Sequence, residues 1–201
     1  MKKILIFVTT LMLCFTNAFS EDGPYIGFKP SKLKVEWSTV EGIDLNEVYD
    51  DEYDVMDFHL GYNIGNSFIE LGYFNSSEEG LSASASAGGI TVTGTSSLEM
   101  DGFRIGTGYN HQINDNWNIR PFINYYDIDY DASLSLTVTG SATFTAAADA
   151  SGSESMIDAG LGADYVIDEN SKIGFSYAQS IDDIEDTDKV ETLAVTASYK
   201  F

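Results

Sequence analysis

The stretch TLAVTASYKF, residues 192–201, alternates apolar residues with small or polar ones up to the end of the chain. Leu193, Val195, Tyr199 and Phe201 share one parity, so in a β-strand they would lie on one face. The last residues of a water-soluble domain usually fray into solvent. A patterned, aromatic terminus therefore predicts a final strand that stays paired up to its last residue.

Seven further segments carry the same two-residue period, and polar turns separate them. Their apolar rows cover residues 25–37, 56–64, 69–73, 103–109, 117–125, 157–167 and 173–177. The first row is even-numbered at Ile26 and Phe28 but odd-numbered from Leu33 onward, so we expect a register slip near Pro30. Pro121 lies inside the fifth row and predicts either a lost ladder hydrogen bond or a local bulge.

The connections between these segments alternate in length. Residues 63–67, 113–116 and 167–171 are tight turns rich in Asn, Asp, Gly and Ser, whereas 37–54, 75–99, 127–154 and 179–190 are long and polar. Short turns on one side and long loops on the other are typical of a transmembrane β-barrel. Apart from the N-terminal segment, no apolar run approaches the length of a membrane-spanning helix, so only strands could cross a membrane.

The two faces of each segment indicate which one meets lipid. Small or polar residues such as Gly72, Gly106 and Asn118 alternate with the large apolar ones, which reverses the pattern of a water-soluble barrel. Aromatic residues at the ends of the rows predict two interfacial girdles. The predicted girdle residues are Tyr62, Tyr109, Trp117, Tyr165 and Tyr199 near the short turns, and Tyr73, Tyr125 and Tyr177 near the long loops.

Over nearly all of residues 21–201 the pattern resembles the small bacterial outer-membrane barrels of the OmpX, OmpA membrane domain and opacity-protein type. Leu193, Val195, Tyr199 and Phe201 resemble the C-terminal assembly signal of such proteins. The resemblance implies an all-β fold: an eight-stranded antiparallel transmembrane β-barrel with short periplasmic turns and long extracellular loops. It also implies insertion by the outer-membrane assembly machinery, contact with outer-membrane lipid, and location in the outer membrane of a Gram-negative bacterium.

The N-terminal segment has the features of a secretory signal peptide. Two lysines, an apolar run over residues 4–15 and a small-x-small site at 18–20 predict cleavage after residue 20 and a barrel domain over 21–201. The sole cysteine, Cys14, would leave with the signal, so we expect no disulfide or Cys-ligated metal in the mature chain. Losing Lys2 and Lys3 would take the formal charge from −22 to −24, which excludes nucleic acid as a partner.

Charged residues of inward parity predict an ion-pair network in the barrel lumen. Its predicted members are Glu70, Arg104, Arg120, Asp158, Asp164 and Lys172, and Asp57, His59 and Lys200 share their parity. We expect Glu70 and Asp158 to be the carboxylate partners of Arg104 and Arg120. A narrow barrel filled by such a network would be plugged, whereas a network that opens would make a gated channel.

Neither catalysis nor a specific metal site is predicted. His59 and His111 have no neighbouring serine that would suggest a nucleophile and base. Asp127-Ile-Asp-Tyr-Asp131 begins like a calcium loop, but Ala132 stands where glycine is needed and Val138 where the bidentate glutamate is needed. We expect no catalytic residues, no cofactor and no metal.

The two longest connections retain a period of two. GLSASASAGGITVTG (80–94) and SLSLTVTGSATFTAA (133–147) share the string TVTG at 91–94 and 137–140. Either strands three to six continue as a protruding sheet with open edges on strands three and six, or these are flexible loops. The sequence favours a monomeric, non-enzymatic surface protein that contacts an extracellular partner, with a small porin-like channel or ligand conduit as the alternative.

Overall fold

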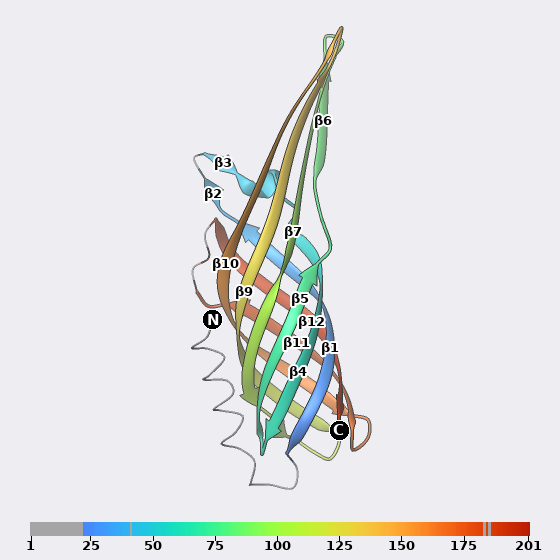
Figure 1. The fold of residues 1–201 in the computed structure, drawn as a ribbon, viewed down its shortest axis with the longest axis vertical. Coiled ribbons are helices and arrows are strands. Elements are labelled where there is room, and N and C mark those ends of the chain that lie inside the picture. The colour runs from blue at the N-terminus through green and yellow to red at the C-terminus, as the bar shows by residue number, and fades with distance from the viewer. Residues whose placement is uncertain (1–21, 41, 183, 185) are drawn as a thin grey trace.

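The computed structural model describes residues 22–40, 42–182, 184 and 186–201, so the predicted signal peptide lies outside the described residues. Eight of its strands form an antiparallel ring (Figure 1). They are β1 (Gly23–Trp37), β4 (Glu52–Ile64), β5 (Ser67–Ser76), β7 (Ile90–Tyr109), β9 (Trp117–Thr139), β10 (Thr143–Val166), β11 (Ser171–Ser180) and β12 (Thr187–Lys200). This confirms the predicted eight-stranded barrel. Among the described residues, none of the helical structure is long and apolar enough to cross a membrane.

The last strand closes the ring against the first. β12 pairs with β1 from Trp37 down to Tyr25, which lies opposite Lys200. The backbone N–H of Phe201 then donates to the carbonyl of Pro24 at 3.1 Å. The last strand is therefore paired up to its final residue. This pairing closes the ring, and without it the first and last strands would both have open edges.

The short elements lie in the connections. β2 (Thr39–Val40), β3 (Ile43–Asp44) and the 3-10 helix η1 (Leu45–Glu47) belong to the long connection between β1 and β4, and β8 (His111–Gln112) follows β7.

The turn between β10 and β11 is built on Asp168, whose carboxylate accepts the backbone N–H groups of Asn170 and Ser171 at 2.9 and 2.8 Å. These bonds hold the pKa of Asp168 below its usual range.

The predicted slip at Pro30 is wrong. β1 pairs with β4 in one unbroken register from Gly23 opposite Asn63 to Lys34 opposite Glu52, and the irregularity toward β12 lies between Glu36 and Trp37. Odd-numbered residues of β1 face inward along its length, so Val35 is buried inside the barrel. In the lower part of β1 the apolar residues, Ile26 and Phe28, face lipid because the barrel interior there is polar. In the upper part the interior is apolar, so Val35 is an apolar residue that faces inward.

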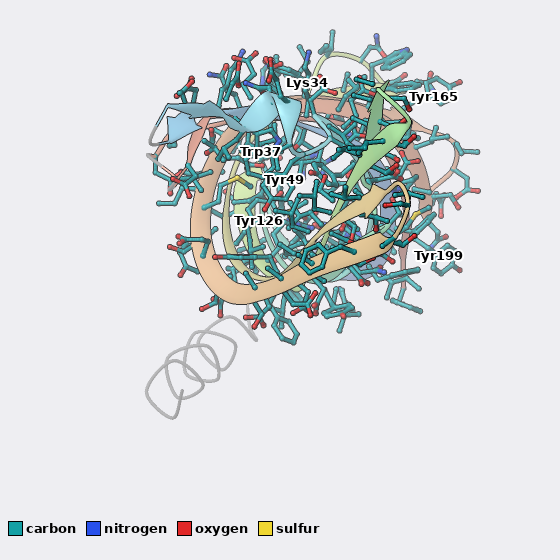
Figure 2. All side chains as sticks on the ribbon, turned by 90° about the horizontal axis from the view of Figure 1, so that it is seen from above. Lys34, Trp37, Tyr49, Tyr126, Tyr165 and Tyr199 are labelled. Carbon is teal, nitrogen blue, oxygen red and sulfur yellow. The ribbon has the colours of Figure 1, made fainter. Side chains whose placement is uncertain are left out.

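The barrel interior has two layers. Toward the long loops it holds a buried apolar cluster, made of Val35, Tyr53, Phe74, Leu98, Tyr126, Met156 and Val190. Toward the short turns it holds buried charged and amide side chains. Seen along the long axis, Tyr126 lies inside the ring, whereas Lys34, Tyr165 and Tyr199 point outward (Figure 2). The interior is thus filled by side chains, as the small strand number requires.

Pro121 causes no bulge. β9 and β10 keep a single register through Leu161 opposite Pro121. On the other side of β9, pairing with β7 ends at Phe122 and pairing with β8 begins at Ile119. Pro121 therefore faces the break between β7 and β8, where a missing backbone donor disturbs the ladder least.

Two of the long connections are mainly strands. β6 (Ser82–Ala87) folds back on the outer end of β7 through Gly88 and Gly89, which have φ of 59° and 79° and suit a tight hairpin turn. β7, β9 and β10 remain paired up to Thr91, Thr139 and Thr143. The order β6-β7-β9-β10 forms a sheet that rises above the other strands (Figure 1). We call it the protruding sheet.

The edges of the protruding sheet differ in part from the prediction. Its outer strands are β6 and the upper half of β10. Strand three, β5, ends at Ser76, so the edge expected there belongs to the separate strand β6. Strand six, β10, has the expected edge, since its pairing with β11 begins only at Asp158.

Candidate functional site in the barrel interior and above it

Most of the inward charges lie on four adjacent strands of the ring, β4, β5, β7 and β9, and on β10, while Lys29 of β1 and Lys172 of β11 add two more. Asp57 and His59 come from β4, Glu70 from β5, Arg104 from β7 and Arg120 from β9, and all are buried. Their inward direction follows from strand alternation. The residue number of each differs by an even number from that of another inward-facing side chain on the same strand.

Arg104 lies at the centre of the network and is 1 % exposed. Its Nε donates to Asp57 Oδ2 at 2.6 Å, and Nη2 reaches Asp57 Oδ1 at 3.3 Å. Its Nη1 donates to Glu70 Oε2 at 2.8 Å and to Asn124 Oδ1 at 2.9 Å. One guanidinium thus joins four strands, with the forked geometry that makes arginine suited to buried carboxylates.

Both carboxylates have further partners. His59 Nδ1 lies 2.9 Å from Asp57 Oδ1, and Lys29 Nζ lies 3.8 Å from Asp57 Oδ2. Glu70 Oε1 accepts the hydroxyl of Tyr25 at 2.8 Å and lies 3.4 Å from Arg120 Nη1. The buried charges are therefore mutually compensated, which a low-dielectric interior requires.

The structure brings together most of the predicted network but arranges it differently. Glu70 contacts both arginines, and Arg120 Nε lies 3.4 Å from Asp164 Oδ2. Asp158 is instead bound by neutral donors, Asn124 Nδ2 at 2.7 Å and the Tyr126 hydroxyl at 3.1 Å. Lys172 lines a cavity of about 30 Å³ together with Arg120 and Asp164.

Two contributors escape prediction from the sequence, because the strand pattern does not identify Tyr25 and Lys29 as inward-facing. Asp57 is placed inside the barrel by the pattern but is not assigned to Arg104. The odd parity of Tyr25, Lys29 and Val35 is the available signal. This signal is hard to read from the sequence, because the odd-numbered residues of the upper part of β1 are apolar and look like lipid-facing residues.

The lower interior is closely packed. A Cβ placed on Gly27 would lie 2.1 Å from Nε2 of His59, and one on Gly61 would lie 2.1 Å from Cζ of Tyr25. A cavity of about 10 Å³ lies beside Arg104 and Glu70, and one of about 40 Å³ lies beneath the apolar cluster. Spaces of this size hold at most one or two waters.

The predicted girdle and terminal residues lie on the outer surface. Tyr73 donates to Asp101 at 3.0 Å and Tyr177 hydrogen-bonds Glu191, while Trp117 packs edge-on against Tyr165 with ring centroids 5.2 Å apart. Tyr62, Tyr109 and Tyr125 share this outward parity, as do Leu193, Val195, Tyr199 and Phe201. Amphipathic rings at both ends of an apolar belt suit the two membrane interfaces.

Residues 6–201 match the family described as "Outer membrane protein beta-barrel domain". The crystal structure of Neisserial surface protein A (NspA) superposes with a TM-score of 0.50 at 9 % identity, over 92 % of this chain and all 100 % of the other. The structure of Ail, the attachment invasion locus protein of Yersinia pestis, superposes with a TM-score of 0.47 at 14 % identity, over 90 % of this chain and 97 % of Ail. The structure of the outer membrane protease OmpT from Escherichia coli superposes with a TM-score of 0.42 at 9 % identity, over 92 % of this chain and 99 % of OmpT. No curated protein matches the chain.

Proposed function

The chain belongs to the outer membrane protein beta-barrel domain family and is an outer-membrane protein of a Gram-negative bacterium, and on that premise we propose that it is a non-enzymatic surface protein. In this proposal the barrel is an anchor. The protruding sheet and the acidic loops around it make the contacts outside the membrane. Its partner is an extracellular protein or surface.

The protruding sheet is the observation that carries the proposal. Continuous pairing of β7, β9 and β10 gives these connections a regular shape that flexible loops would lack. β6 and residues 143–156 of β10 leave backbone donors and acceptors unpaired along two edges. Such edges bind added strands readily, so they suit contact with another chain.

The packed interior supports an anchor rather than a conduit. The apolar cluster closes the barrel toward the long loops, and the Arg104 network closes it toward the short turns. Opening a path would separate Arg104 from Asp57 and Glu70 and would leave charges buried without partners.

The absence of catalysis is likewise part of the proposal. His59 is buried, and its Nδ1 is held by Asp57 and its Nε2 lies 3.7 Å from Glu70. An imidazole enclosed in this way cannot reach a substrate from solvent. His59 therefore serves as a member of the network.

A gated conduit is the second candidate function, and buried polar atoms favour it. His59 Nε2 and Thr196 Oγ1 are buried with no hydrogen-bond partner among the described residues. Both groups line the cavity beside Arg104. A single water molecule in this cavity would satisfy them, and a chain of such waters, formed if the interior loosens, would be the start of a narrow path.

Surface display is tested with single cysteines on intact cells and a membrane-impermeant maleimide. We expect Ser86→Cys, on β6 of the protruding sheet, to be labelled on intact cells. Glu169→Cys, in the short turn between β10 and β11, is the matched control and should stay unlabelled until the envelope is opened. Labelling of position 169 from outside, or protection of position 86, would contradict the proposal.

A shortened variant separates the anchor from the contact surface. Replacing residues 80–96 by a short turn removes β6 and the upper part of β7 but leaves the strands of the ring below them. We expect this variant to insert normally, since the ring closes without the protruding sheet. Loss of insertion would show that the sheet is needed for the barrel itself and would contradict the proposed division.

A further inference from the structure

The two faces of the protruding sheet differ in chemistry. Val92, Leu136 and Phe144 are separated by even numbers of residues from Leu98, Tyr126 and Met156 of the apolar cluster, so they continue the inner face of the barrel. We call this the apolar face; it carries Ile90, Val92, Leu134, Leu136, Val138 and Phe144. The opposite hydroxyl face carries Thr91, Thr93, Thr95, Ser135, Thr137 and Thr145.

The apolar face is uncovered. Ile90 is 50 % exposed, Leu136 46 % and Phe144 66 %. The hydroxyl face suits water, and its side chains also bond one another, as Thr137 does with Thr145 at 3.2 Å. Contiguous exposed apolar side chains usually mark a contact surface, because covering them removes their area from water.

The distribution of charge along the chain limits which partner could cover the apolar face. Residues 80–98 and 132–148 contain no charged side chain, in a chain whose formal charge is −22. Acidic residues begin immediately below, where Glu99 lies directly opposite Asp131. A basic partner would find no complementary charge on this sheet. Another copy of the acidic chain could approach closely only here, since like charge repels it elsewhere.

The rows of side chains are also self-complementary. The central strands β7 and β9 carry Ile, Val and Leu on the apolar face, whereas the flanking strands carry mainly alanine, namely Ala83, Ala85, Ala87, Ala146 and Ala148. Two such faces offset by about two strands would set the large rows of one over the small rows of the other. Alternating large and small residues pack without voids in this way.

We propose that the apolar face binds the apolar face of a second copy that approaches from an opposing membrane. The proposal rests on the surface-protein function above and names its partner. Packed sheets lie about 10 Å apart, and each apolar face looks toward the axis of its own barrel. Two barrels side by side in one membrane would therefore overlap. Copies that point toward each other do not overlap, so the contact links two membranes.

The contact between one pair of copies is small. With an offset of two strands, the two overlapping strands of about eight residues cover roughly 250 Å² on each copy, about 500 Å² in total, which is below the range of a specific interface. A single pair would bind weakly. Many copies on two facing membranes would add their contributions, as in other multivalent contacts.

Vesicle clustering tests the proposal. The chain refolded from residues 21–201 is inserted into phosphatidylcholine vesicles, and their apparent size is followed by light scattering. We expect protein-bearing vesicles to cluster, Leu136→Asp to weaken clustering more than about tenfold, and Ser135→Asp on the hydroxyl face to leave it unchanged. Dispersed wild-type vesicles, or equal effects of the two variants, would overturn the proposal.

Cross-linking provides a readout that does not depend on the aspartate variants. Residues 21–201 contain no cysteine, so an introduced thiol is unique. When two vesicle populations carry differently tagged copies, a short bismaleimide should join Leu136→Cys between populations and should join Ser135→Cys much less. Equal yields at both positions, or links only within one population, would refute the proposal. Surface labelling of Ser86→Cys is a separate readout, so failure of this inference is distinguishable from failure of surface display.

Discussion

Arg104 and the glycines around it determine how tightly the lower interior closes. The guanidinium contacts Asp57, Glu70 and Asn124 from three other strands. Glycine at the neighbouring inward positions leaves room for the rings of Tyr25 and His59. A narrow barrel can hold so many large polar side chains only where others are absent.

Replacing one such glycine tests this packing. In Gly61→Ala the new methyl group would overlap the Tyr25 ring at 2.1 Å and displace its hydroxyl from Glu70. We expect the free energy of unfolding, measured with urea on the refolded barrel, to fall by about 1–3 kcal/mol. Gly94→Ala is the matched control, because nothing lies within 4 Å of its Cβ. Equal stability of the two variants would show that the interior is looser than described.

At the scale of the strand, β1 shows where pattern reading fails. The predicted slip assumes that one chemistry lines the interior from end to end. It assigns Leu33, Val35 and Trp37 to the lipid side, whereas the apolar cluster places Val35 inside. The strands and their inward parity could be predicted elsewhere in the ring, because a period of two depends on local geometry alone.

Substitutions in β1 distinguish the two placements. Val35→Ala removes methyl groups from the apolar cluster and should lower the free energy of unfolding by about 2 kcal/mol. Lys34→Ala removes an exposed side chain whose Nζ is 3.9 Å from Asp51, and its effect should stay below about 1 kcal/mol. Urea titrations of both variants measure this. A larger loss at position 34 than at position 35 would restore the slipped register.

The partners within the network could not be predicted to the same extent. Which carboxylate meets Arg104 depends on the relative shift of strands around the ring, and no local pattern specifies that shift. Asp57 and Glu70 reach Arg104 from β4 and β5, whereas Asp158 is held by Asn124 and Tyr126. Glu70 could be anticipated only because its strand is adjacent to that of Arg104.

We propose that the last strand has a role in assembly that is separable from its role in the folded barrel. The ring of Phe201 faces outward, while its backbone N–H bonds Pro24. Phe201→Ala keeps that backbone bond, so we expect refolding in detergent to be unchanged. In cells we expect much less inserted barrel, quantified as the folded fraction in isolated outer membranes. Lys200→Ala serves as the comparison at the neighbouring position. Normal insertion of Phe201→Ala would remove residue 201 from the assembly signal.

For the whole molecule, the structure separates a closed barrel from a protruding sheet, and we propose that the first is the anchor and the second the contact surface. The barrel has an apolar outer belt and a filled interior, and the protruding sheet extends two of its hairpins (Figure 1). Acidic side chains such as Glu99 and Asp131 lie at the base of that sheet, and its upper part, residues 80–98 and 132–148, is uncharged. The two longest connections retain a two-residue period because they continue the hydrogen-bonded strands of the barrel into the protruding sheet.

A closed interior distinguishes an anchor from a conduit, and single-channel conductance in planar bilayers measures it. We predict that the refolded wild-type barrel is silent, because the Arg104 network and the apolar cluster leave no continuous path. Arg104→Ala removes the cation that holds Asp57 and Glu70 and should produce brief openings, whereas Lys32→Ala, whose ion pair with Asp54 is exposed, should stay silent. Stable, reproducible openings of the wild type would contradict the anchor and favour a conduit.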